Sequence, residues 1–198
     1  MPKLKETTRA SREARILQAA VACFARHGYH ATTMDAIAYE AGIAKGVTYL
    51  YFDSKEVLFL ALYHQWGCAS REGIEAAIAE LSPQERGSPK RVLRLVVTVT
   101  GQHVQRDPAL CRVLMEGRTL AAFFPAIAER VSREQRHGQE QLEVLIRAGV
   151  AVGEWPRTTD VSSRATLIRA TLHGLMATWH AAPGSFDWDA TAVALVDW

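Results

Sequence analysis

Cysteine is scarce in this sequence, and the three that occur, Cys23, Cys68 and Cys111, lie far apart. Their odd number and wide spacing match neither a disulfide framework nor a zinc site, and they are typical of a reducing cytoplasm. No run approaches the roughly 18 apolar residues that a membrane-spanning helix needs. The first residues, MPKLKETTRASREAR, lack the apolar core of a signal peptide. We therefore expect a soluble, cytoplasmic protein without a membrane partner.

Catalytic and cofactor-binding motifs are also missing. The seven histidines are scattered, and the sequence contains no H-E-x-x-H, no P-loop and no G-x-G-x-x-G. Glu134 and His137 form one E-x-x-H pair, but a di-iron bundle needs two such pairs and further glutamates. The sequence therefore predicts no enzyme, no cofactor and no bound metal.

Apolar residues, by contrast, make up 48% of the 198 residues, and 22% are charged. This composition is that of a globular protein with a sizeable core. The net charge is +2, but it is unevenly placed, since residues 1–55 carry +3 and the remainder −1. The excess of basic charge permits a polyanionic partner for the N-terminal part without requiring one.

Apolar residues at helical spacing predict a first helix from about Ser11 to His27, with Ile16, Ala20 and Phe24 on its inner face. Gly28 follows as the expected residue that ends the helix in a left-handed conformation. Thr33 then predicts the N-cap of a short helix over residues 34–41.

The next segment, residues 47–52 with the sequence VTYLYF, is β-branched and aromatic, so propensity alone favours a strand. An isolated strand leaves its backbone unpaired, whereas a short helix from Ala44 to about Leu50 does not. Two helices joined by a turn with glycine match the helix-turn-helix motif, whose second helix enters the major groove of DNA. Asp53 and Glu56 predict a variant capping box for the following helix, which runs to about residue 81.

The remaining sequence also predicts helices. Residues 82–89 are expected to form a loop because of their Pro, Gly and Ser content. Further helices are expected at about 89–105, 108–120, 124–150, 160–182 and 186–198. The β-branched run 96–100 would suit a strand but has no partner. The sequence therefore predicts an all-α fold of about nine helices.

The run GYHATTMDAIAYEAGIAKGVTYLYFDSKEVLF strongly resembles the DNA-binding domain of TetR-family transcriptional regulators, and the resemblance extends from about Arg12 to Leu62. The residues at family spacing are Gly28-Tyr29, Thr32-Thr33, Ile37-Ala38, Ala41-Gly42, Lys45-Gly46, Tyr49, Tyr51-Phe52 and Lys55-Glu56. The resemblance implies an all-helical homodimeric repressor with a three-helix DNA-binding domain at 1–56 and a ligand-binding and dimerisation domain at 57–198.

The resemblance implies DNA contacts from Thr33, Lys45, Gly46, Val47, Thr48, Tyr49, Tyr51 and Lys55. Lys45 is unfavourable for the dipole at a helix N-terminus, which makes sense if phosphate or a guanine edge lies nearby. Two residues depart from the family pattern. Ala44 replaces a capping Ser or Thr, at a cost of about 1 kcal/mol. Thr48 replaces an apolar residue, so we expect its methyl group to pack and its hydroxyl to bond back to the helix.

The basic N-terminal arm, comprising Lys3, Lys5, Arg9 and Arg12, is expected either to follow the DNA or to be a disordered tail. Tyr49 and Tyr51 have the alternative of packing as ordinary aromatic residues.

Candidates for a ligand cavity, each with plain core packing as the alternative, are Trp66, His103, Met115, Arg118, Phe123, Phe124, His173 and Trp179. Thr171, Gly174 and Thr178 form a stripe of small residues that suits either a dimer interface or close packing within one subunit.

The favoured function is therefore a repressor that leaves a palindromic DNA operator when a small molecule binds. A redox-sensing regulator that uses Cys68 or Cys111 is one alternative. The other is an all-helical protein that does not bind DNA.

Overall fold

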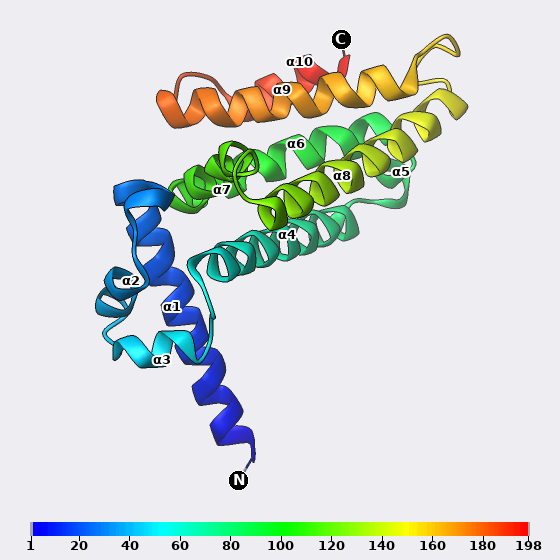
Figure 1. Ribbon diagram of the computed structural model, residues 1–198. Coiled ribbons are helices and arrows are strands. Elements are labelled where there is room, and N and C mark those ends of the chain that lie inside the picture. Colours follow the sequence, from blue (N-terminus) through cyan, green and yellow to red (C-terminus); the bar gives the residue numbers. More distant parts are fainter. Residues whose placement is uncertain (1, 198) are drawn as a thin grey trace. The chain divides into compact units, whose positions relative to one another are not determined.

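The computed structural model describes residues 2–197, with side chains from residue 9 onward, and all regular secondary structure in that range is helical (Figure 1). This confirms the all-α prediction. The helices are α1 (Pro2–Ala31), α2 (Met34–Glu40), α3 (Lys45–Tyr49), α4 (Lys55–Glu80), α5 (Pro83–Arg86), α6 (Pro89–Arg106), α7 (Pro108–Leu120), α8 (Pro125–Ala151), α9 (Val161–Ala181) and α10 (Trp188–Asp197).

Neither β-branched run forms a strand, since residues 96–100 lie within α6 and the run 47–52 begins in α3 and continues as a turn. The amide of Phe52 donates to the carbonyl of Thr48 at 3.0 Å, so the chain still turns helically at the end of α3. In α6, the hydroxyl of Thr100 donates to the carbonyl of Val96 at 2.7 Å and so adds to the helical bonding of that turn. Local β-propensity is therefore overridden in both places by backbone bonding that needs no partner strand.

Helix α5 lies in a segment that was predicted to be a loop. Ser82 and Glu85 form a complete capping box, since the amide of Glu85 donates to Ser82 Oγ at 3.3 Å and the amide of Ser82 donates to Glu85 Oε2 at 3.0 Å. Pro83 occupies the first helical position, where its missing N–H costs nothing. The Pro and Ser residues that indicated a loop therefore start a single capped helical turn.

Helix α4 begins differently from the prediction. The amide of Val57 donates to Ser54 Oγ at 3.1 Å, so Ser54 rather than Asp53 caps the helix. Gly28, the predicted end of the first helix, is a kink inside α1, because its φ of 75° and ψ of 167° are not helical; the predicted left-handed helical conformation is not the one adopted. The adopted conformation is open to glycine and strained for other residues.

The chain divides into two compact units, which we describe separately. Unit 1 comprises residues 1–66 and 109–130, and therefore joins the helix-turn-helix segment to most of α7. Its core includes Ile16, Ala20 and Phe24 of α1, all buried as the apolar pattern predicted, together with Ile37 and Phe59.

Unit 2 comprises residues 67–108 and 131–198. Its core joins four helices, α6, α8, α9 and α10, through Leu93, Leu142, Ile146, Trp155, Ala165, Ile168 and Val196. Trp155 lies directly against Gly149, where an added Cβ would be 2.2 Å from Cε3 of the indole ring. No helix within residues 2–197 is both long enough and apolar enough to cross a membrane.

Candidate nucleic-acid interface

The candidate DNA-reading element is α3, which follows α2 after a short turn. Thr33 caps α2 as predicted, because its side-chain oxygen accepts from the amide of Ala36 at 3.1 Å. Ala44 precedes α3 in an extended conformation and supplies no side-chain cap. The amide of Val47 donates to the carbonyl of Ala44 at 2.9 Å, and this bond starts the helix.

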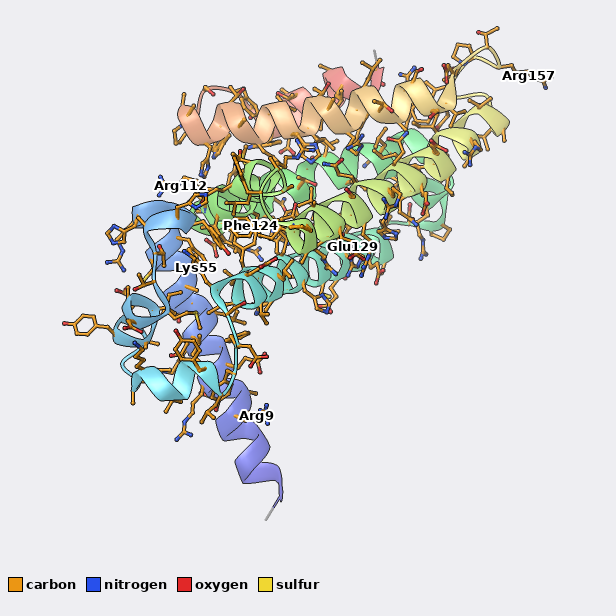
Figure 2. All side chains as sticks on the ribbon, viewed as in Figure 1. Arg9, Lys55, Arg112, Phe124, Glu129 and Arg157 are labelled. Carbon is orange, nitrogen blue, oxygen red and sulfur yellow. The ribbon has the colours of Figure 1, made fainter. Side chains whose placement is uncertain are left out.

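Solvent exposure divides the residues predicted to contact DNA. Thr33, Lys45, Gly46 and Tyr49 are exposed, and Val47, Tyr51 and Lys55 are half-buried. Leu50, the residue that follows α3, is 76% exposed. Arg9 lies on α1 (Figure 2), with its guanidinium 5.7 Å from the centre of the Tyr51 ring. The side chains of Lys3 and Lys5 lie outside the described side chains.

Thr48 does not fit the prediction of a DNA contact. Its side chain is fully buried, and its hydroxyl has no hydrogen-bond partner, so the predicted bond back to the helix is absent. The side chain therefore packs inside unit 1 instead of facing DNA. A buried hydroxyl without a partner loses its hydration without compensation.

Replacing Thr48 by valine should therefore stabilise the protein, by about 1 kcal/mol, since it removes the unpaired hydroxyl and keeps a β-branched side chain. Urea unfolding measures the change, and Thr119→Val at an exposed site of α7 is the matched control, expected to gain nothing. A loss of stability in the Thr48 variant would show that the hydroxyl is bonded after all.

Lys45 is paired with an acid on the neighbouring helix. Its Nζ lies 2.7 Å from Asp35 Oδ2, and both side chains are more than half exposed. The hydrogen bond and the negative charge of Asp35 raise the pKa of Lys45, so the ammonium stays charged. Because an exposed pair contributes little to stability, phosphate can replace Asp35 as the partner of Lys45.

Asp35→Asn should therefore increase operator affinity by about threefold, because it releases Lys45 and removes a negative charge near the phosphates. Fluorescence anisotropy with an operator duplex measures the effect. Glu72→Gln, the same charge change at an exposed position of α4, should leave affinity unchanged. Unchanged or weaker binding of the Asp35 variant would place Lys45 away from the phosphates.

Lys55 has a role that was not predicted. Its Nζ donates to the carbonyls of Tyr29 at 2.6 Å, Thr32 at 2.7 Å and His30 at 3.3 Å. It also lies 4.4 Å from the centre of the Tyr29 ring. Burial lowers the pKa of this ammonium group. Lys55 therefore ties the start of α4 to the end of α1, and a phosphate contact would compete with these bonds.

Two residues of α7 hold the same part of α1, and neither was among the predicted site residues. Glu116 Oε1 accepts from the amide of Tyr29 at 3.0 Å, and Arg112 donates to the carbonyl of Ala25 (Figure 2). Their i, i+4 spacing places them on one face of α7, and this spacing was the only sequence feature that could have indicated a shared role. The buried Tyr29 ring stacks on Phe24, and burial raises the pKa of its hydroxyl to about 12.

The predicted ligand residues are dispersed. Phe124 lies 5.3 Å from Tyr29 in the aromatic cluster of unit 1, and Phe123 is 69% exposed. The His103 ring fills the space beside Gly73. Trp66, Met115 and His173 are half-buried, and Arg118 is exposed. Trp179 lines a cavity between α6, α9 and α10.

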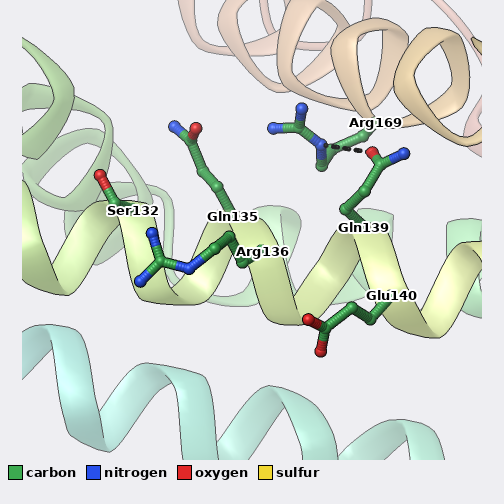
Figure 3. Close-up of a pocket in the computed structure, with 6 residues that line it drawn as sticks. All are labelled: Ser132, Gln135, Arg136, Gln139, Glu140 and Arg169. Atoms are coloured by element: carbon green, nitrogen blue, oxygen red, sulfur yellow. Dashed lines mark hydrogen bonds between the residues drawn. The ribbon is translucent and has the colours of Figure 1, made fainter. Parts of the chain in front are cut away.

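A second, polar groove lies on α8 and α9 (Figure 3), and none of the predicted ligand residues lines it. Its volume is about 360 Å³. Arg169 Nε donates to Gln139 Oε1 at 3.3 Å across the groove. The other lining residues are Ser132, Gln135, Arg136 and Glu140.

The predicted dimer residues Thr171, Gly174 and Thr178 are exposed on α9.

The two cysteines of the redox alternative are free thiols in different surroundings. Cys111 is buried, whereas Cys68 is half-buried and accepts a bond from Arg71 Nη2 at 3.3 Å. None of these contacts supports redox sensing.

Comparison with known proteins agrees with this architecture. The model of bacterial regulatory proteins of the tetR family matches residues 16–62, and the model of the C-terminal region of BetI-type transcriptional repressors matches residues 89–197, more than half of the chain.

The fatty acid metabolism regulator protein of Bacillus subtilis (strain 168) is 26% identical over 164 residues, covering 83% of this chain and 81% of that protein. The transcriptional regulator AcrR of Shigella flexneri is 26% identical over 190 residues, covering 93% and 85%. The structure of FadR from Bacillus subtilis in complex with stearoyl-CoA has a TM-score of 0.79 at 25% identity, covering 93% of this chain and 95% of that one. The chain therefore belongs to the TetR family of bacterial transcriptional regulators.

Proposed function

We propose that this regulator is a homodimeric repressor that binds a palindromic operator through α3 and leaves it when a small ligand binds. The observation that carries the proposal is the exposed surface of α3, which presents Lys45 and Tyr49, together with Arg9 of α1, whose guanidinium lies over the ring of Tyr51. Lys45, Tyr49 and Tyr51 supply phosphate contacts, and Val47 and Leu50 supply apolar contacts for thymine methyl groups. The protein acts in the cytoplasm, where its operator lies.

The face of α9 supports the homodimer. Leu167, Thr171, Gly174 and Thr178 are all exposed and carry no charge, and Val193 of α10 is 47% exposed. Small residues at this spacing allow a helix of a second copy to approach closely, and covering them removes apolar surface from water. Two recognition helices about 34–36 Å apart would then read half-sites one DNA turn apart.

A charged residue in this face tests the dimer. Thr171→Lys should convert the dimer to a monomer, as measured by sedimentation, because it places two uncompensated cations in the interface. A variant that remains dimeric would move the interface away from α9.

The relatives suggest the ligand class. One is a fatty acid metabolism regulator, and a similar structure contains stearoyl-CoA. In this chain, Arg136 and Arg169 of the polar groove offer guanidinium groups suited to phosphate. The proposed ligand is therefore a long-chain acyl thioester of coenzyme A.

Operator selection and release test the whole proposal. Duplexes selected from a random library should be palindromic, and binding should weaken steeply with salt, because phosphate contacts release counterions. Stearoyl-CoA should release the selected duplex, while free coenzyme A and stearate should do so only weakly. Weak, salt-insensitive binding would favour the protein that does not bind DNA. Specific binding that stearoyl-CoA leaves intact would overturn only the ligand class.

A further inference from the structure

A cavity of about 260 Å³ in unit 2 is lined by residues from α6, the end of α9, the start of α10 and the loop between α9 and α10. Figure 1 shows these helices. It is separate from the polar groove on α8 and α9, with which it shares no lining residue. The residues that line it are Thr98, Gln102, Gln105, Trp179, Phe186, Asp187, Trp188 and Asp189. Three of these are aromatic and two are acidic, and none is basic.

The three aromatic rings form a corner. Phe186 contacts both indoles, with its ring centre 5.5 Å from that of Trp179 at an interplanar angle of 76° and 4.9 Å from that of Trp188 at 63°. The two indoles are 6.1 Å apart and inclined by 50°. Because each ring is steeply inclined to the others, the rings form walls of different orientation instead of one flat stack.

The position of Trp188 is fixed by packing. The residue is only 5% exposed, and its ring lies over Gly101 of α6, where an added Cβ would be 2.5 Å from Trp188 Cγ. Its buried indole N–H has no hydrogen-bond acceptor among the described residues. The Trp188 ring is therefore held in place without a ligand. Its indole N–H remains a free donor, to which an oxygen atom of a bound molecule could supply the acceptor.

The two carboxylates are held by neutral donors. Asp189 Oδ1 accepts from the hydroxyl of Thr98 at 2.7 Å, and Asp187 Oδ1 accepts from the amide of Ala190 at 2.7 Å as it caps α10. Neither bond neutralises a charge, so the cavity presents negative charge next to aromatic surfaces.

We propose that this cavity binds an organic ammonium ion. Aromatic faces attract a cation through the ring quadrupole, and quaternary ammonium groups are recognised in this way by aromatic cages. Asp187 and Asp189 add direct attraction, whereas an anion would be repelled. A hard metal ion requires six or more oxygen ligands, which the aromatic walls do not supply. This site is independent of the operator and of the proposed acyl thioester ligand.

Titration with tetramethylammonium chloride tests the proposal. The signals of the indole N–H groups of Trp179 and Trp188 should shift in a saturable way in a proton–nitrogen NMR spectrum, while that of Trp155, buried elsewhere in unit 2, should stay in place. Sodium chloride at the same ionic strength and tert-butanol, a neutral molecule of similar shape, should cause no saturable shift. Equal shifts with tert-butanol, or none with tetramethylammonium, would overturn the proposal.

The charge requirement is tested by Asp189→Asn. Asparagine can still accept from Thr98, so the fold is retained while affinity for tetramethylammonium falls about tenfold. Asp160→Asn removes a capping aspartate of α9 that does not line the cavity, and it should leave affinity unchanged. Unchanged affinity in the Asp189 variant, or an equal loss in both variants, would contradict the assignment.

Discussion

Replacing Gly149 by alanine is expected to destabilise the protein by about 3 kcal/mol, because the new methyl group overlaps a ring that cannot move. The Cβ would lie 2.2 Å from Cε3 of Trp155 and 3.4 Å from Cβ of Pro89. Trp155 is held in turn by Lys90 and Arg164, whose charged groups lie 5.7 and 5.1 Å from its ring centre. The free energy of unfolding in urea measures the loss.

A second glycine of α8 provides the matched control. An added Cβ at Gly138 would meet nothing within 4 Å, so Gly138→Ala should stabilise the protein by about 1 kcal/mol through helix propensity alone. If the free energy of unfolding falls in the Gly149 variant and rises in the Gly138 variant, the effect of packing is separated from that of helix propensity. A stabilising Gly149→Ala would mean that Trp155 is free to move aside.

Lys45→Ala is expected to reduce operator affinity by roughly ten- to a hundredfold, because the proposed homodimer would lose one proposed phosphate contact at each of its two α3 helices. Lys45 is exposed and pairs only with the exposed Asp35 among the described contacts, so its loss should leave folding and dimerisation intact. Gel shifts with the selected operator measure the affinity, and sedimentation measures the dimer.

The control for Lys45→Ala is Arg86→Ala, which removes one positive charge from an exposed position of α5. It should leave operator affinity unchanged, since α5 belongs to unit 2, whereas the helix-turn-helix of α2 and α3 belongs to unit 1. An equal loss of operator affinity in the two variants would indicate a general effect of the protein's net charge. An unaffected Lys45 variant would contradict the proposed role of this residue.

The helical fold and the DNA-reading head were predictable from sequence because their signals are local. Apolar spacing marked α1, Thr33 marked the start of α2, and Gly28 marked the kink in α1. At residues 47–52 and 96–100 the residue types favoured a strand, but the absence of a partner strand correctly argued against one, and the runs lie in α3 with its following turn and in α6. The caps at Ser54 and Ser82 were missed because neighbouring residues offered equally plausible signals.

The contacts of the site were less predictable because they depend on residues distant in sequence. Glu116 is 87 residues from Tyr29, and Lys55 reaches the carbonyl of a residue 26 positions earlier. The i, i+4 spacing of Arg112 and Glu116 indicates that they share a face of α7, but it does not indicate which distant residues they contact. The aromatic corner was missed for the same reason, since only Trp179 had been selected and its neighbours belong to the following loop and helix.

The pair of Lys45 and Asp35 has a consequence for ion exchange on DNA. Asp35 acts as an internal counterion of Lys45, so in the proposed complex operator binding would exchange one anion for another at the same ammonium group. When phosphate displaces Asp35, the freed carboxylate attracts a cation from solution and offsets one of the cations that the DNA releases. Net cation release per head is then smaller than the number of phosphate contacts, and Asp35→Asn should restore the difference.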